Sequence, residues 1–132
     1  MNEETKNYVR LWIAKASDDL IVIDKLTQFE VIATSAVCFH CQQVVEKYLK
    51  AFLIAHGVEI RKTHNIEFLL AECEEFDSDF STIEPGDLND FGVAIRYPDD
   101  FYSPTTRETL EHKKIALEVQ KMVEQKLKGM LD

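Results

Sequence analysis

The 132-residue chain lacks several features that mark whole classes of protein. No apolar stretch approaches the roughly 18 residues that a membrane-spanning helix needs, so we expect no membrane association. The first residues lack the basic start and apolar stretch of a signal peptide, and the expected location is therefore the cytoplasm. The three cysteines are an odd number, which favours reduced thiols over a disulfide framework.

Motifs for common chemistries are also missing. The sequence contains no glycine-rich phosphate loop and no serine elbow. Cys38 and Cys41 have the spacing of a zinc-binding pair, but no second matched pair completes a four-ligand site. A redox-active pair would need a preceding strand, which the pattern does not predict. We therefore expect these cysteines in the core, and neither a metal nor a cofactor.

Negative charge is what the chain has in excess, with a formal net charge of −9 at pH 7. Most of it lies in residues 71–90, which hold eight acidic side chains and no basic one. A solvated acidic surface explains this segment. Residues 31–64 and 105–132 are slightly basic, so these parts of the chain can still meet a phosphate group.

Apolar residues recur at helical spacing through most of the chain. Length and pattern predict a single domain, residues 1–132, which is all-α: an antiparallel up-and-down four-helix bundle with one additional short helix. The central helix is apolar over about half its circumference, so it must touch neighbours on several sides. The expected helices cover residues 4–28, 31–56, 64–75, 85–95 and 105–128, with Thr63 capping the third and Pro85 in the first turn of the fourth.

The remaining side of the central helix carries five polar groups within nine residues. Several are spaced i,i+4, so their side chains meet on the helix surface. Glutamine amides both donate and accept hydrogen bonds, and lysine can hold a phosphate group. The pattern predicts an intramolecular network, a ligand site, or both together. The residues are Gln42, Gln43, Glu46, Lys47 and Lys50.

A proline- and aromatic-rich loop over residues 96–106 is expected to join this polar side. Arg96 can hold phosphate or pair with Glu46 or Asp99, and Tyr97 can stack on a base. We count Arg96, Tyr97 and Asp99 among the candidate ligand-binding residues. On the first helix, Asp19 is expected on a solvated face, with a binding role as the alternative.

These residues resemble the HEPN family of small all-helical prokaryotic proteins. The resemblance rests on the run Phe-His-Cys-Gln-Gln-Val-Val-Glu-Lys-Tyr-Leu-Lys-Ala-Phe-Leu at 39–53, on Thr63-His64-Asn65-Ile66 and on Arg96-Tyr97-Pro98-Asp99. Trp12, Ala16, Asp19 and Leu20 near the start also fit it. The resemblance implies a homodimer, with a minimal nucleotidyltransferase as a possible protein partner.

HEPN ribonucleases carry an arginine followed four to six residues later by a histidine, and Arg107 and His112 form such a string here. The arginine would neutralise the scissile phosphate and the histidine would move a proton from a ribose 2′-hydroxyl. Five residues rotate about 140° on a helix, so the two side chains converge only at a frayed first turn. Glu108, next to the arginine, would repel phosphate.

These observations lead to two candidate functions of different classes. The first is a HEPN-type binding module for a nucleotide or RNA, acting as the partner subunit of a nucleotidyltransferase. The second is a metal-independent ribonuclease toxin of a toxin–antitoxin pair that uses Arg107 and His112. A helical scaffold without a ligand is a third possibility.

Overall fold

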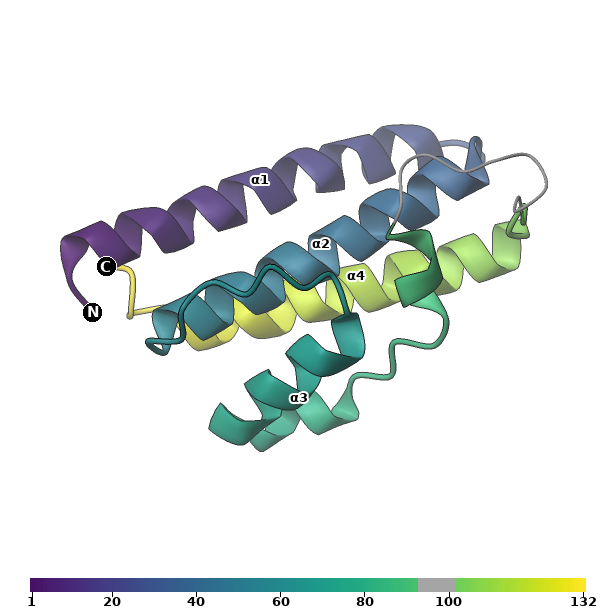
Figure 1. Ribbon diagram of the computed structural model, residues 1–132. Coiled ribbons are helices and arrows are strands. Elements are labelled where there is room, and N and C mark those ends of the chain that lie inside the picture. Colours follow the sequence, from purple (N-terminus) through teal and green to yellow (C-terminus); the bar gives the residue numbers. More distant parts are fainter. Residues whose placement is uncertain (93–101) are drawn as a thin grey trace.

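The computed structural model describes residues 1–92 and 102–132, and this part of the chain is all-helical (Figure 1). Four α-helices and two short 3-10 helices follow one another: α1 (Glu3–Thr27), α2 (Thr34–Ala55), α3 (Ile66–Phe76), η1 (Ser78–Thr82), η2 (Leu88–Phe91) and α4 (Thr106–Leu127). No strand occurs among the described residues. The all-α class is therefore confirmed, and each α-helix begins and ends within three residues of its predicted range.

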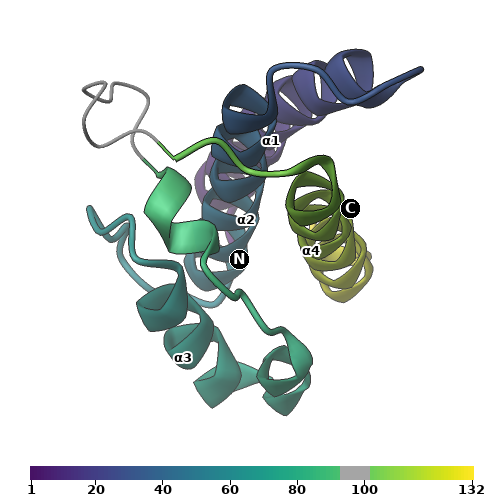
Figure 2. The ribbon, with the colours of Figure 1, turned by 90° about the vertical axis from the view of Figure 1, so that its right-hand side faces the viewer.

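Helix α2 forms the centre of the molecule, as its apolar sequence predicts. Fifteen of its 22 residues are buried. It packs against α1, α3, α4 and η2, and Figure 2 shows it surrounded by these elements. Tyr48, Leu49 and Phe52 are buried almost completely in the resulting core. Burial of each such side chain stabilises the fold by roughly 1.5–3 kcal/mol relative to exposure.

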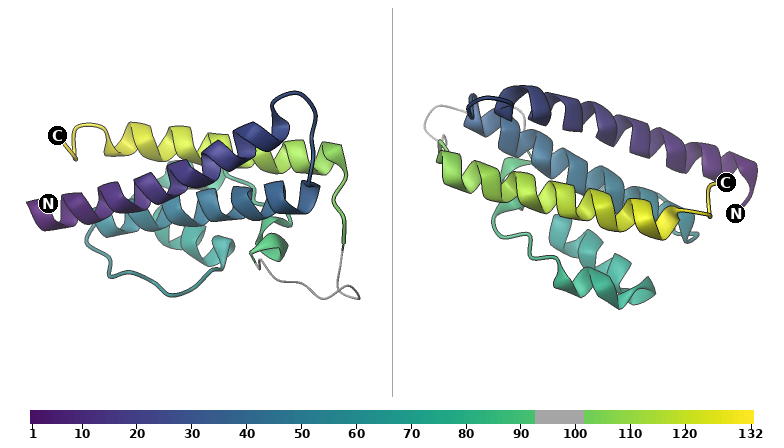
Figure 3. Two further views of the ribbon diagram at one scale, coloured as in Figure 1. Left: turned by 90° about the horizontal axis from the view of Figure 1, so that it is seen from above. Right: turned by 180° about the vertical axis from the view of Figure 1, so that it is seen from behind.

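One helix direction differs from the predicted up-and-down bundle. α1 and α2 are antiparallel neighbours, joined by the short connection over residues 28–33 (Figure 3). Helix α4 runs in the same direction as α2, as the second and fourth helices of such a bundle do (Figures 1 and 3). Helix α3, however, also runs in roughly the direction of α2, because residues 56–65 return the chain along α2 before α3 begins (Figure 1).

Local backbone conformation explains two differences from the predicted ranges. Helix α2 begins at Thr34 rather than at residue 31, because Ala33 has a left-handed φ of 48°. The short α-helix predicted over 85–95 is wrong in its described part. Gly86 has a φ of 56°, which a helix interior does not accommodate, and only Leu88–Phe91 form a 3-10 turn.

The other long helices are amphipathic. In α4 the buried residues, among them Ala116, Val119 and Val123, recur at helical spacing on one side. Trp12 of α1 is partly buried and packs against the core. Within the described residues, no helix combines the length and apolarity that crossing a membrane requires.

Candidate functional site

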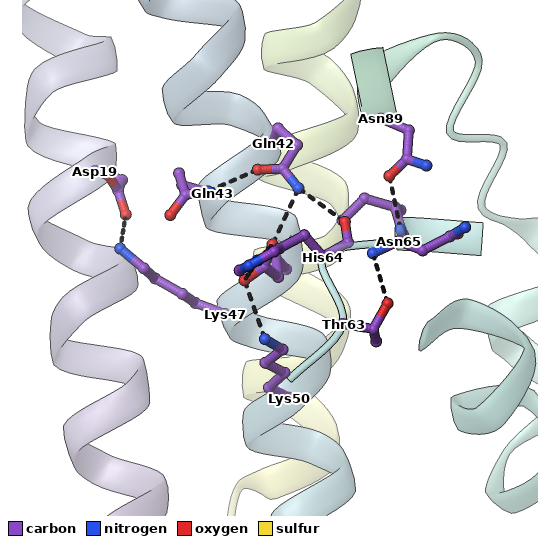
Figure 4. A network of polar contacts seen from close by, with 11 residues as sticks. Asp19, Gln42, Gln43, Lys47, Lys50, Thr63, His64, Asn65 and Asn89 are labelled. Atoms are coloured by element: carbon purple, nitrogen blue, oxygen red, sulfur yellow. Dashed lines mark hydrogen bonds and ion pairs between the residues drawn. The ribbon is translucent and has the colours of Figure 1, made fainter. Parts of the chain in front are cut away.

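The polar side of α2 carries a hydrogen-bonded network of buried side chains (Figure 4), and Glu46 is its central acceptor. The Gln42 amide donates to Glu46 Oε1 at 3.1 Å, and the Lys50 ammonium donates to Glu46 Oε2 at 3.1 Å. Both contacts are the i,i+4 pairs that the sequence predicts. Gln42 is 0% exposed, and Glu46 and Lys50 are each 4% exposed. Buried charges of this kind persist because they are paired.

The segment before α3 covers this network. His64 Nδ1 lies 3.0 Å from Glu46 Oε1, and the His64 backbone carbonyl accepts a second bond from the Gln42 amide at 3.2 Å. The helix that follows is capped by Asn65, whose side chain accepts from Phe68 N. Thr63, predicted as this cap, instead accepts from Asn65 N two residues outside the helix.

A second cluster joins α2 to α1. Asp19 Oδ1 lies 2.7 Å from His40 Nδ1, and Asp19 Oδ2 accepts from Lys47 Nζ at 2.6 Å. Figure 4 shows Lys47 extending from α2 towards Asp19. Asp19 is 7% exposed, so the solvated face expected for it is wrong. Its burial is compensated because each carboxylate oxygen has a partner.

Gln43 belongs to the first cluster, because its amide donates to Gln42 Oε1 at 2.8 Å. Gln43, His40 and Lys47 are only partly buried and follow one another at spacings of three and four on α2. The polar side of α2 therefore has a buried part, which contains Gln42 and Glu46, and a partly exposed edge of three polar side chains. We call Gln43, His40 and Lys47 the polar edge.

Four of the five candidate residues on α2 come together in one network, namely Gln42, Gln43, Glu46 and Lys50, whereas Lys47 joins Asp19 and His40. Arg96, Tyr97 and Asp99 lie outside the described residues. The sequence does not single out His40 and His64 as candidates, and it gives Asp19 a binding role only as the alternative. Their signal in the sequence was weak, because a lone histidine or aspartate on a helix or loop acquires a partner only through tertiary packing. His40 alone could have been found, since it shares a helical stripe with Gln43 and Lys47.

The structure does not bring Arg107 and His112 together as a pair. The Arg107 side chain is 90% exposed and lies 3.6 Å from Glu111, one turn further on. The His112 side chain is 6% exposed, and its Nε2 lies 2.7 Å from Asp87 Oδ1. Its Nδ1 is buried and has no hydrogen-bond partner among the described residues. Neither nitrogen is presented to a substrate in this arrangement.

Helix α4 begins with a capping box, in which the carboxylate of Glu108, the residue after Arg107, is hydrogen-bonded. Thr105 Oγ1 accepts from Glu108 N at 3.1 Å, and the Glu108 carboxylate accepts from Thr105 N at 3.2 Å. The Tyr102 hydroxyl donates to Glu108 at 2.8 Å. The Tyr102 bond, followed by that from the Thr105 backbone, lowers the pKa of Glu108. The negative charge beside Arg107 is therefore held in place.

The cysteines are core residues, as predicted. Cys38, Cys41 and Cys73 are free thiols and each is 0% exposed. Burial raises the pKa of Cys41 to about 12, so its thiol stays protonated at neutral pH. Within residues 1–92 and 102–132, no three or more His, Cys, Asp or Glu side chains are arranged to hold a metal ion.

Comparison with known proteins finds one family. The model of the HEPN domain matches residues 9–127, which is most of the chain. No curated protein sequence and no solved structure matches the chain.

Proposed function

Because the chain belongs to the HEPN family, we propose that it is a cytoplasmic binding module for a nucleotide or RNA, rather than a catalyst. The observation that carries this proposal is the polar edge of α2. Lys47 is positioned by Asp19, and Gln43 by Gln42, before any ligand arrives. Polar groups already held in place lose little conformational freedom on binding.

The chemistry of the edge suits a nucleotide. An ammonium group has three donors, so Lys47 can bond a phosphate while keeping its contact with Asp19. The Gln43 amide can both donate to and accept from a base edge. The described network shows that the intramolecular alternative also holds, because the same residues stabilise the contact between α1 and α2.

A calorimetric titration with ATP and with a short single-stranded RNA tests the proposal. The wild-type protein is expected to bind at least one of these, and Lys47→Ala is expected to weaken that binding. Lys121→Ala is the matched control, because Lys121 is an exposed lysine on α4. Flat titrations for the wild type, or equal losses for both variants, would leave only a scaffold without a ligand.

The proposal includes a homodimer with a nucleotidyltransferase as the possible further partner. The dimer is supported by apolar side chains on the surface of α4. Leu110 and Leu117 lie one heptad apart on this helix and are 45% and 43% exposed. Light scattering at tens of micromolar is expected to give the mass of two chains, and a monomer mass would exclude the dimer.

The ribonuclease that uses Arg107 and His112 is the second candidate, because both residues lie within the part of the chain that matches the HEPN domain. The Asp87 carboxylate bonds the His112 ring through Nε2. Activity would require Asp87 to leave, because His112 Nε2 is occupied in the described arrangement. The test is expression without a partner: growth arrest that His112→Ala relieves supports the nuclease, and normal growth excludes it.

A further inference from the structure

One of the four histidines, His40, has its ring held by a carboxylate of the neighbouring helix α1. Asp19 accepts only, so the contact with Asp19 Oδ1 at 2.7 Å places the ring proton on His40 Nδ1. The lone pair of His40 Nε2 is then free to accept a hydrogen bond. No described residue bonds this atom, and it is not among the buried side-chain atoms that lack a partner.

The other histidines do not combine an open Nε2 with an accessible lysine on the same carboxylate. His112 has its Nε2 bonded to Asp87 and its Nδ1 buried. His56 bonds the Phe52 carbonyl through Nδ1 and stacks on the ring of Phe52. His64 is bonded to Glu46 and exposed, but the lysine on the same carboxylate is Lys50, whose side chain is only 5% exposed.

An accessible cation shares the Asp19 carboxylate with His40. The Lys47 side chain is 21% exposed and bonds the other oxygen of this carboxylate at 2.6 Å. Because both groups contact one carboxylate, His40 Nδ1 and Lys47 Nζ lie within about 7.5 Å of each other. Two donors of the ammonium group remain for a ligand.

We propose that the cluster of Asp19, His40 and Lys47 recognises a ribonucleotide. The His40 Nε2 atom accepts a hydrogen bond from a ribose hydroxyl, and the Lys47 ammonium group bonds the phosphate on the adjacent carbon. Asp19 is the positioning residue, since it fixes the tautomer of one group and the location of the other. This inference rests on the proposed function, because it names the ligand groups that the polar edge holds.

The consequence is discrimination between ribose and deoxyribose. The 2′-hydroxyl is the group by which a protein distinguishes RNA from DNA at a given position. A 2′-deoxynucleotide would leave His40 Nε2 unpaired in the complex, whereas the phosphate contact with Lys47 would be unchanged. One neutral hydrogen bond of this kind changes the affinity by about three- to tenfold.

Calorimetry with 3′-AMP and 2′-deoxy-3′-AMP tests this on the full chain. The wild type is expected to bind 3′-AMP about three- to tenfold more tightly. His40→Asn should remove the difference, because the shorter amide can still reach Asp19 but no longer the position of Nε2. His56→Gln is the control and should keep the difference in affinity between the two nucleotides. The ring signal of His40 in NMR spectra should shift with 3′-AMP alone.

The outcomes separate the two proposals. Equal affinities of the wild type for both nucleotides, or a preference that survives in His40→Asn, would overturn this inference and leave the proposed function standing. Binding of neither nucleotide, of ATP or of RNA would remove both. A thermal unfolding measurement on His40→Asn verifies that the variant is folded. The comparison of the two nucleotides on the wild-type protein does not depend on the variant.

Discussion

Replacing Glu46 by alanine should destabilise the protein more than almost any other single change outside the apolar core. Glu46 accepts hydrogen bonds from Gln42 and Lys50, both of which are buried with it. In the variant Glu46→Ala the Lys50 ammonium stays in an interior position without a counter-charge. Gln42 keeps its bond to the His64 carbonyl, so the unpaired charge is the main cost.

The magnitude follows from the burial of this pair. Removing one partner of a buried ion pair costs about 3–5 kcal/mol, because the remaining charge is desolvated and unpaired. The lost contact with His64 adds little, since the His64 side chain is 71% exposed and water replaces the bond. Native domains are stable by only about 5–15 kcal/mol, so Glu46→Ala should lose a large share of the total.

Urea unfolding followed by circular dichroism measures this loss. The matched control is the double variant Glu46→Leu/Lys50→Met, in which both charges are removed and the Lys50 position, 5.5 Å from the Trp12 ring, stays filled by an apolar chain. This variant should lie within about 1 kcal/mol of the wild type or be more stable. A loss below about 1 kcal/mol for Glu46→Ala, or a double variant as unstable as the single one, would refute the reasoning.

Two further predictions concern the core. Burial, with the bond to Glu124, raises the pKa of Tyr48, so the folded state holds the phenolic proton more tightly than the unfolded state, in which tyrosine titrates near pH 10. This stabilisation is complete below about pH 10 and falls as the pH rises above it. Urea unfolding should therefore show a steeper alkaline loss for the wild type than for Tyr48→Phe, and equal slopes would contradict the assignment. The three buried cysteines should not react with a thiol reagent in the native protein and should all react after unfolding, whereas fast native labelling of Cys41 would contradict its burial.

The helices could be predicted because apolar periodicity and end signals agree. Gly57 has a φ of 85° immediately after the C-cap of α2, which is the conformation expected of a glycine that ends a helix. The directions of the helices could not be predicted in this way. Whether α3 runs parallel or antiparallel to α2 depends on the path of residues 56–65, and apolar periodicity carries no information about that path.

The sequence predicts which residues of α2 form the candidate site, but not how deeply they are buried. Spacing alone places Gln42, Glu46 and Lys50 on one side of a helix. It does not reveal that they are buried, because that depends on α1 and the segment around His64 closing over them. Asp19 was assigned to solvent for the same reason, since its partners His40 and Lys47 are more than twenty residues away.

The most direct test is to map where a short single-stranded RNA contacts the protein, using backbone amide signals in NMR spectra. We predict that the shifts concentrate on residues 36–50 of α2 and residues 12–23 of α1, where the polar edge and Asp19 lie. Shifts concentrated instead on residues 105–115 of α4, or no shifts at saturating RNA, would contradict a binding site on the polar edge.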